Sequence, residues 1–211
     1  YEKTIDMVIL THPHADHVNG LIEVLKRYQV KNVLMAGVEY KSAGYAAFLE
    51  EIYQRKIPVI FATGNNDFQL GTAIIDMLFP FNSTQGQSFV NIHGSSIVFR
   101  LIYGKNIFLF TDDMEAEKEN ELIRAGLDLR ADFLKVGHHG SHTSSSEPFL
   151  ERIKPKYAAI SCGVDNKFHH PRPITIQHLQ ERKITLLRTD LDGTIEVTSD
   201  GENVKMHAMG K

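Results

Sequence analysis

The stretch Thr11-His12-Pro13-His14-Ala15-Asp16-His17 places three imidazoles and a carboxylate within seven residues. The residues before it, Ile5 to Leu10, form a short, mostly apolar run that is rich in β-branched side chains, which predicts a buried strand. Residues two apart in an extended segment point to the same side, so we expect His12 and His14 to share one metal ion. The stretch therefore predicts a metal site at the end of a strand.

A helix is predicted directly after this stretch. Apolar residues recur there with helical period, at Leu21, Ile22, Val24, Leu25 and Tyr28. Because Asn19-Gly20 precede that pattern, we expect Asp16 and His17 in the turn between strand and helix, facing a second metal position. Imidazole nitrogens suit zinc, iron or another late first-row metal, and a carboxylate adds a hard oxygen ligand. The alternative is a histidine-rich surface turn that binds nothing.

Two ions require more ligands than one turn provides, and further candidates flank other apolar runs. His93 precedes a β-patterned run over 97–103, Asp112-Asp113 follow the run 107–110, and His138-His139 follow the run 133–136. Sites in α/β sheets form where strands end. This regularity is the strongest support for the metal site within the sequence itself.

These motifs resemble the metallo-β-lactamase superfamily and, within it, the C-terminal domain of ComEC-type competence proteins. The resemblance covers nearly the whole chain and rests on His12 to His17, Phe110 to Asp113, Leu134 to Ser141, Asn166 with His170-Pro171, and Arg188 to Asp190 with Gly193. It implies an α/β fold, the four-layer αββα sandwich. The family has several strands before the first histidine motif, whereas only ten residues precede Thr11 here. We therefore expect the first N-terminal strands of the sandwich to be missing.

The resemblance also implies a dinuclear site, for which we expect zinc, with manganese and iron as alternatives. His12, His14 and His93 would hold one ion; Asp16, His17 and a histidine of the His138-His139 pair would hold the other, and Asp113 would bridge them. Neighbouring residues of an extended strand end point in opposite directions. We therefore expect one of the pair to bind metal, and favour His139.

Two positions depart from the family pattern. Asp112 stands where the family usually has glycine, which adds a carboxylate that crowds the site or adds charge. His93 stands where ComEC-like members often have asparagine, so its role as a third ligand stays open.

The resemblance further implies a hydrolase that acts on a phosphodiester, in the manner of a nuclease during DNA uptake, because two close cations activate water and polarise a phosphoryl oxygen. Asp16 would orient the attacking water or receive its proton. His170 would donate to the substrate; its alternative is a histidine packed in a proline-stiffened loop. Ser141, Thr143 and the serines 144–146 would bind phosphate oxygens or else cap the next helix.

Two alternatives remain for the function. One is a catalytically weak, metal-stabilised scaffold of a DNA-import system, attached to or associated with a membrane competence protein. The other is a hydrolase of a different ester, a lactone or a β-lactam. The expected partners are a phosphodiester or small ester and, for the DNA-related function, single-stranded DNA.

Composition agrees with one domain over residues 1–211. The chain has 211 residues, of which 42% are hydrophobic, enough for a core. No apolar run reaches the ~20 residues that span a bilayer. The net charge of −3 lacks the basic excess of a general DNA-binding surface. With Cys162 as its single cysteine, the chain forms no intrachain disulfide.

The rest of the sequence alternates predicted strands and helices, which favours an α/β class. We expect a helix from its cap at Ser42 to Lys56, and a hairpin bracketed by Asn65-Asn66 and Gly71. Further helices are expected over 115–125 and 175–182. The polar loop 82–88 either overhangs the site or is a disordered connector.

Overall fold

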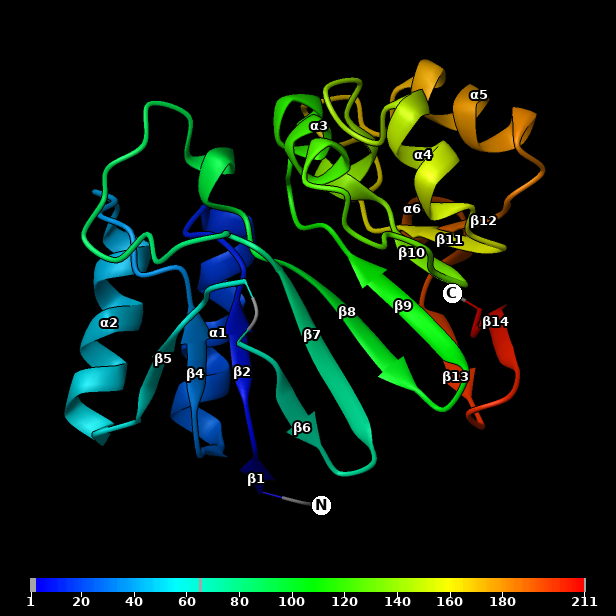
Figure 1. Cartoon of the computed structure of the whole chain (residues 1–211). Helices are drawn as coiled ribbons and strands as arrows, with labels where there is room; N and C mark the ends of the chain where they lie inside the picture. Colours follow the sequence, from blue (N-terminus) through cyan, green and yellow to red (C-terminus); the bar gives the residue numbers. More distant parts are fainter. Residues whose placement is uncertain (1–2, 65, 211) are drawn as a thin grey trace. The chain divides into compact units, whose positions relative to one another are not determined.

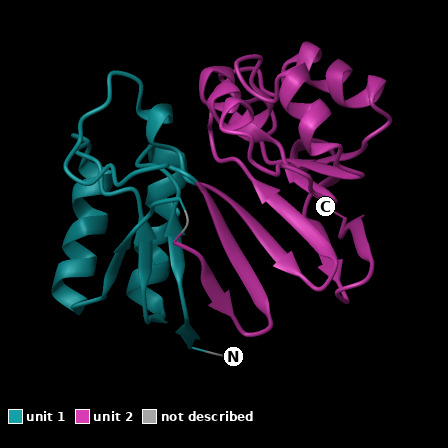
Figure 2. Cartoon of the chain, in the orientation of Figure 1, with its two compact units in different colours: residues 1–64, 79–97 teal, residues 65–78, 98–211 magenta. Residues whose placement is uncertain are grey.

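The computed structural model describes residues 3–64 and 66–210, which form two compact units (Figure 2). Unit 1 comprises residues 1–64 and 79–97, and unit 2 comprises residues 65–78 and 98–211. Each unit has its own sheet and its own helices. None of the helices in the described part of the chain has the length and apolar character that crossing a bilayer requires.

Unit 1 is built on a parallel sheet of three strands in the order β2 (Val8–Leu10), β4 (Val33–Met35), β5 (Val59–Phe61). The prediction of one strand over Ile5–Leu10 is wrong. Its first part is a separate strand, β1 (Thr4–Ile5), which pairs with β3 (Gln29–Val30). The two strands separate because the exposed Asp6 lies between them, where its carbonyl accepts a hydrogen bond from Asn32 Nδ2.

Helix α1 (Ala15–Arg27) begins earlier than the sequence pattern predicts. The His14 carbonyl accepts hydrogen bonds from the backbone N–H groups of His17 and Val18, at 3.0 and 2.9 Å. Asp16 and His17 therefore lie in the first helical turn, and the expectation that they lie in a turn before the helix is wrong. Gly20, expected before the helix, lies inside it.

The second helix of unit 1, α2 (Ala43–Arg55), confirms the predicted cap. The Ser42 hydroxyl accepts from the Tyr45 N–H at 3.1 Å, and Lys56 ends the helix in a left-handed conformation. Apolar side chains of both helices pack with those of the sheet, forming the core Val8, Leu10, Val18, Leu25, Val30, Val33, Met35, Tyr45, Phe48, Ile52 and Ile57.

The loop 82–88 is attached to unit 1 by hydrogen bonds. Thr84 Oγ1 donates to the Ala36 carbonyl at 2.8 Å, and the Gly86 N–H donates to the Gly37 carbonyl at 2.9 Å. It is therefore not a disordered connector. The loop leads to the short 3-10 helix η1 (Ile92–Ser95).

Unit 2 contains a sheet of seven strands. Figure 1 labels them β6 to β12. The order in the sheet is β12 (Thr185–Arg188), β11 (Tyr157–Ile160), β10 (Phe133–Lys135), β9 (Asn106–Phe110), β8 (Val98–Tyr103), β7 (Ala73–Phe79), β6 (Phe68–Leu70). Strands β9 to β12 are parallel, so their carboxyl ends lie at the same edge. The hairpin β6-β7 confirms the predicted turn at Gly71, while Asn65 lies outside the described residues.

Helices and a terminal hairpin complete unit 2. The helices are η2 (Gly137–Gly140), α3 (Ala116–Arg124), α4 (Glu147–Ile153), α5 (Pro173–Glu181) and the short α6 (Thr189–Asp192). The hairpin β13 (Ile195–Ser199)-β14 (Val204–Ala208) packs apolar residues against Phe108 and Phe133 of the sheet. Helix α3 follows the carboxyl end of β9, and η2 follows the carboxyl end of β10. The residues at these two strand ends carry the polar groups of the candidate site.

Candidate metal centre

Unit 1 gathers four histidines. His12 and His14 follow β2, His17 lies in the first turn of α1, and His93 lies in η1. The ring centroid of His12 lies 4.7 Å from the ring centroid of His14, 4.1 Å from that of His17 and 5.5 Å from that of His93. His93 Nε2 lies 3.3 Å from His14 Nδ1. The structure thus brings His93 to the first motif, although the two histidines lie 79 positions apart along the chain.

The local backbone explains why these imidazoles converge. The Thr11 carbonyl accepts a hydrogen bond from the Ile97 N–H at 3.1 Å, which joins the segment after β2 to the segment after η1. The Asn91 side chain accepts from the His93 N–H at 3.1 Å and fixes the start of η1. His12 is 1% exposed, so this cluster extends from the core of unit 1.

Asp16 has the most exposed side chain of the first motif's ionisable residues in unit 1, with 56% of its surface accessible. Its Oδ2 lies 4.0 Å from His17 Nε2. His17 Nδ1 in turn lies 3.3 Å from Thr11 Oγ1. A carboxylate beside an imidazole and open to solvent has the character of a ligand or a proton acceptor.

Unit 2 gathers a second set of side chains, in which imidazoles surround the carboxylate of Asp113. Asp113 follows the end of β9 and is buried. Asp113 Oδ2 lies 3.8 Å from His138 Nε2, and Asp113 Oδ1 lies 3.6 Å from His139 Nε2. Each carboxylate oxygen therefore faces a different imidazole. The parallel pairing of β9 with β10 produces this arrangement, because both strands end at the same edge of the sheet.

The expectation of an extended backbone at His138-His139 is wrong. Both residues lie in η2 with left-handed conformations, at φ of 47° and 53°. Side chains of consecutive residues alternate only along an extended strand. Here the left-handed turn directs both imidazoles to Asp113, so the reason for choosing only one of them no longer holds, and the choice of His139 stays a prediction.

The second ring nitrogen of each histidine in this pair has its own partner. His139 Nδ1 lies 2.7 Å from the Ser161 carbonyl oxygen. A carbonyl only accepts, so Nδ1 carries the proton and the lone pair of the neutral ring is on Nε2, the atom that faces Asp113. His138 Nδ1 lies 3.3 Å from Thr143 Oγ1 and 3.8 Å from Glu115 Oε1. Such outer partners are typical of metal-binding histidines.

Glu115 is a residue near this group that the sequence analysis does not single out, whereas Thr143 is considered there together with the neighbouring serines. Glu115 is the N-cap residue of α3, two residues after Asp113, and Thr143 follows η2. An acidic residue so close to a predicted bridging aspartate is a signal that could have indicated Glu115. Nothing in the sequence pattern distinguishes Thr143 from the serines around it.

His170 lies beside the second set of groups. Its ring centroid is 5.7 Å from that of His138, and the ring stacks on Phe168 at 5.8 Å. Burial is the main cause that lowers the pKa of His170, and the nearby Arg172 guanidinium lowers it further. Both effects favour the neutral form of this imidazole.

Ser141 is placed less favourably than His170 for contact with a substrate. The side chain is buried, and its Oγ lies 3.0 Å from Thr143 Oγ1 and accepts from the Thr143 N–H at 3.2 Å. The alternative that serine hydroxyls cap the next helix is wrong. Ser146, the N-cap residue of α4, makes no side-chain cap bond, and Glu119 accepts from the N–H groups there instead.

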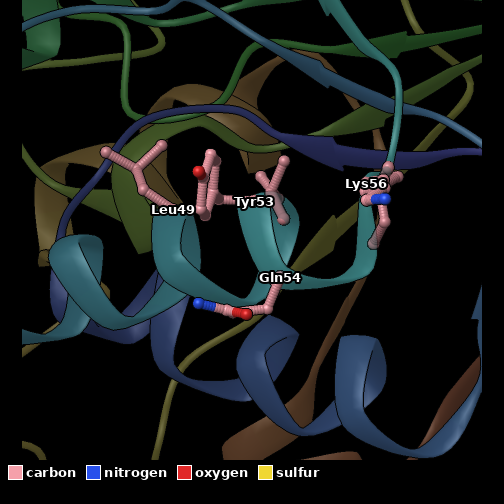
Figure 3. Close-up of a pocket in the computed structure, with 6 residues that line it drawn as sticks. Leu49, Tyr53, Gln54 and Lys56 are labelled. Carbon is pink, nitrogen blue, oxygen red and sulfur yellow. The ribbon is translucent and has the colours of Figure 1, made fainter.

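A separate surface hollow of about 640 Å³ lies on α2 of unit 1 (Figure 3). Its lining comes from the end of that helix and includes Leu49, Tyr53 and Lys56. It contains none of the residues that the sequence predicts for the site. Its lining lacks the combination of imidazole and carboxylate that the two clusters have, so we assign it no chemistry.

Imidazoles in unit 1, and imidazoles with carboxylates in unit 2, form donor sets that fit divalent metal ions. The sequence profile of the Metallo-beta-lactamase superfamily matches residues 2–164. The chain therefore belongs to this superfamily, which confirms the family and the fold expected from the sequence. Metal ions are the cofactors for which the site residues are suited.

Within the superfamily, the chain is similar to competence proteins, as the sequence predicts. It is 32% identical to ComE operon protein 3 of Bacillus subtilis (strain 168) over 194 residues, which are 92% of this chain and 24% of that protein. It is 32% identical to Recombination protein 2 of Haemophilus influenzae over 193 residues, which are 92% of this chain and 22% of that protein. The chain thus spans about a quarter of the length of these relatives.

Solved structures agree on the fold. CmlA, a diiron beta-hydroxylase from Streptomyces venezuelae, matches 89% of this chain and 44% of its own at a TM-score of 0.58 and 16% identity. Igni18, a novel metallo hydrolase from Ignicoccus hospitalis, matches 95% of this chain and 78% of its own at a TM-score of 0.50 and 11% identity. At such identities the likeness concerns the fold alone.

Proposed function

We propose that this protein is a metal-dependent hydrolase that holds two divalent metal ions, with zinc expected, and cleaves phosphodiesters. The observation that carries the proposal is the group Asp113, His138 and His139, in which one carboxylate faces two imidazole Nε2 atoms. The proton position on His139 leaves its Nε2 able to bind metal. With the proton on Nδ1, Nε2 of His139 cannot donate a hydrogen bond to the Asp113 carboxylate, and a cation between the two acceptors would satisfy both.

The proposed ligands follow the family resemblance. His12, His14 and His93 would hold one ion, Asp16, His17 and His139 the other, and Asp113 would serve both. His138, whose Nε2 also faces Asp113, is the alternative to His139. We propose on this basis that residues 1–211 act as one functional domain, because the ligands come from both units.

The proposed roles of the remaining residues follow the family resemblance and agree with where these residues lie. Bound divalent ions would supply water activation and polarisation of the phosphoryl oxygen. Asp16, whose side chain is exposed beside His17, would accept the proton of the attacking water. His170 would donate an N–H to a substrate oxygen, and Ser141 stays a weaker candidate for the same contact.

The phosphodiester substrate is proposed from the relatives. Two of them carry the names Recombination protein 2 and Competence protein ComA, the latter from Neisseria gonorrhoeae and 35% identical over 119 residues, 56% of this chain and 17% of that protein. With these names and the family resemblance as support, we propose single-stranded DNA during uptake as the substrate, with the chain associated with a membrane competence protein. Hydrolysis of another ester, a lactone or a β-lactam is the alternative within the same chemistry.

The test combines metal content with turnover. Elemental analysis of the purified protein is expected to give two divalent ions per chain, and bis-p-nitrophenyl phosphate is expected to be hydrolysed. Asp16→Ala should lose turnover, whereas Glu23→Ala should keep it, because Glu23 is a carboxylate on the same helix with similar exposure and pairs with Lys26 and Arg27. Less than one ion per chain and no turnover by the wild type would instead support the scaffold function.

A further inference from the structure

Hydrogen bonds within the loop 161–172 fix its backbone, and the loop places His170 beside His138. Asn166 organises it: its side-chain amide donates to the His170 carbonyl at 2.6 Å, and its Oδ1 accepts from the His170 N–H at 2.9 Å. The same amide donates to the Gly163 carbonyl at 2.9 Å. A single polar side chain thus closes the loop and fixes the residues between its two ends.

Phe168 is presented to solvent by this fixed loop. The side chain is 55% exposed, yet its ring lies nearly parallel to that of His170, with 18° between the planes. Single exposed apolar residues need no explanation in general. Here the exposed ring extends a series of rings that continues through His170 to His138, the imidazole that faces Asp113.

Positive charge accompanies this ring. Lys167 Nζ lies 4.9 Å from the Phe168 ring centroid, and Lys167 is exposed. Arg172, at the end of the loop, donates its backbone N–H to the Gly140 carbonyl at 2.8 Å and is half-buried. On a chain of net charge −3, an exposed aromatic ring with a lysine ammonium beside it is suited to a planar group attached to an anion.

We propose that Phe168 is a stacking surface for a nucleobase of single-stranded nucleic acid, adjacent to the phosphodiester that the Asp113 group would act on. The proposal rests on the proposed function, because the phosphodiester defines which groups the base accompanies. Stacking is tolerant of sequence since every base has a π-face, so no base-specific contact is required. Lys167 would contribute by attraction to the phosphate backbone.

Equilibrium binding of labelled oligonucleotides tests this proposal. The probes are a phosphorothioate oligothymidylate, which resists hydrolysis, and an abasic strand with the same backbone, both measured by fluorescence anisotropy with the full chain. Phe168→Ala is expected to weaken binding of the oligothymidylate by about 5- to 150-fold, the range found when a stacking aromatic is removed. Binding of the abasic strand should not change, and Phe168→Leu should behave like the alanine variant.

Phe168→Trp supplies a positive readout if the alanine variant fails to fold. The chain has no tryptophan, so this substitution creates a unique fluorophore. Its emission is expected to be quenched by the oligothymidylate and not by the abasic strand. Tyr53→Trp is the matched control, because Tyr53 is also an exposed aromatic, 76% accessible, on α2 of unit 1, and it should show no quenching.

The proposal is overturned if Phe168→Ala binds both strands as the wild type does, or if it loses the same affinity for both. Its failure is distinguishable from failure of the proposed function. Wild-type hydrolysis of bis-p-nitrophenyl phosphate reports on the metal centre, whereas the difference between the two strands reports only on base stacking.

Discussion

At the scale of single residues, the two adjacent carboxylates of the Thr111-Asp112-Asp113 segment should behave differently. Asp112 has a φ of 52°, in the left-handed region that glycine adopts without strain and aspartate adopts at some cost. Asp112→Gly, which restores the residue usual in the family, is therefore expected to change the free energy of unfolding by less than about 1 kcal/mol. Metal content by elemental analysis should be unchanged.

Asp113→Asn is the contrasting substitution. It has nearly the same volume but removes the charge that faces His138 and His139. We expect this variant to retain less than half of the bound metal and to lose turnover of bis-p-nitrophenyl phosphate. If Asp113→Asn holds as much metal as Asp112→Gly does, Asp113 is not a ligand and the proposed bridging role is wrong.

A pH dependence is expected at Cys162. Burial and the nearby Asp190 raise the pKa of the Cys162 thiol to about 11. The thiolate is the reactive form, so a pKa raised above its ordinary value makes the native thiol unreactive at pH 8. Alkylation by iodoacetamide should be on the order of 100-fold slower in the native protein than in urea, where the pKa returns to about 8.5.

The rate of the native protein should rise continuously between pH 8 and pH 10, while that of the urea-unfolded protein levels off. Mass spectrometry after timed quenching measures both rates. Equal rates in the two states at pH 8 would contradict the burial of the thiol.

At the scale of elements, Glu119 of α3 takes the place of a helix cap for α4. Its two carboxylate oxygens accept hydrogen bonds from the backbone N–H groups of Ser145 and Ser146, at 2.5 and 2.9 Å, and Glu119 is 1% exposed. Removing the acceptors leaves the buried Ser145 N–H without this partner, at a cost of about 1–3 kcal/mol, and the half-buried Ser146 N–H at a smaller cost of about 1 kcal/mol. Glu119→Ala should therefore lower the free energy of unfolding by about 2–4 kcal/mol.

Urea unfolding followed by circular dichroism measures this loss. Glu117→Ala is the matched control, since Glu117 lies on the same helix with an 81% exposed side chain, and it should change stability by less than about 0.5 kcal/mol. Equal effects of the two substitutions would show that Glu119 does not hold the start of α4.

A comparison of α2 with the start of α4 shows where sequence patterns succeed and where they fail. Several elements with clear local signals were predictable, including α2 with its Ser42 cap and the hairpin β6-β7 with its turn at Gly71. The serines before α4 were misinterpreted because a glutamate 26 positions from Ser145 supplies the acceptor. A contact so distant in sequence follows from packing, which local propensity does not contain.

The same distinction applies to the proposed metal ligands. The positions of His12, His14 and Asp113 after strands were predictable, because strand ends have a known place in the fold. The orientation of His138 and His139 was not, because it depends on two consecutive left-handed residues for which neither histidine is the usual choice. Such unusual backbone conformations are concentrated at functional sites, where local rules fail most often.

At the scale of the whole molecule, the proposed ligand set makes stability depend on metal. A ligand that binds only the native state at 100 times its dissociation constant adds about 2.7 kcal/mol. For a chain of this length, each kcal/mol raises the melting temperature by roughly 2–4 °C. Excess zinc should therefore raise the melting temperature of chelator-treated wild type by about 5–10 °C.

Single substitutions, one in each unit, test whether the same ions are bound by ligands of both units. His14→Ala lies in unit 1 and His139→Ala in unit 2, and each is expected to lose most of the zinc-dependent rise measured by calorimetry. His207→Ala should retain it, because His207 lies on β14 and pairs with Glu196 at 2.8 Å. If His139→Ala responds to zinc as the wild type does while His14→Ala does not, the ions are bound by unit 1 alone, and the single functional domain we propose has to be abandoned.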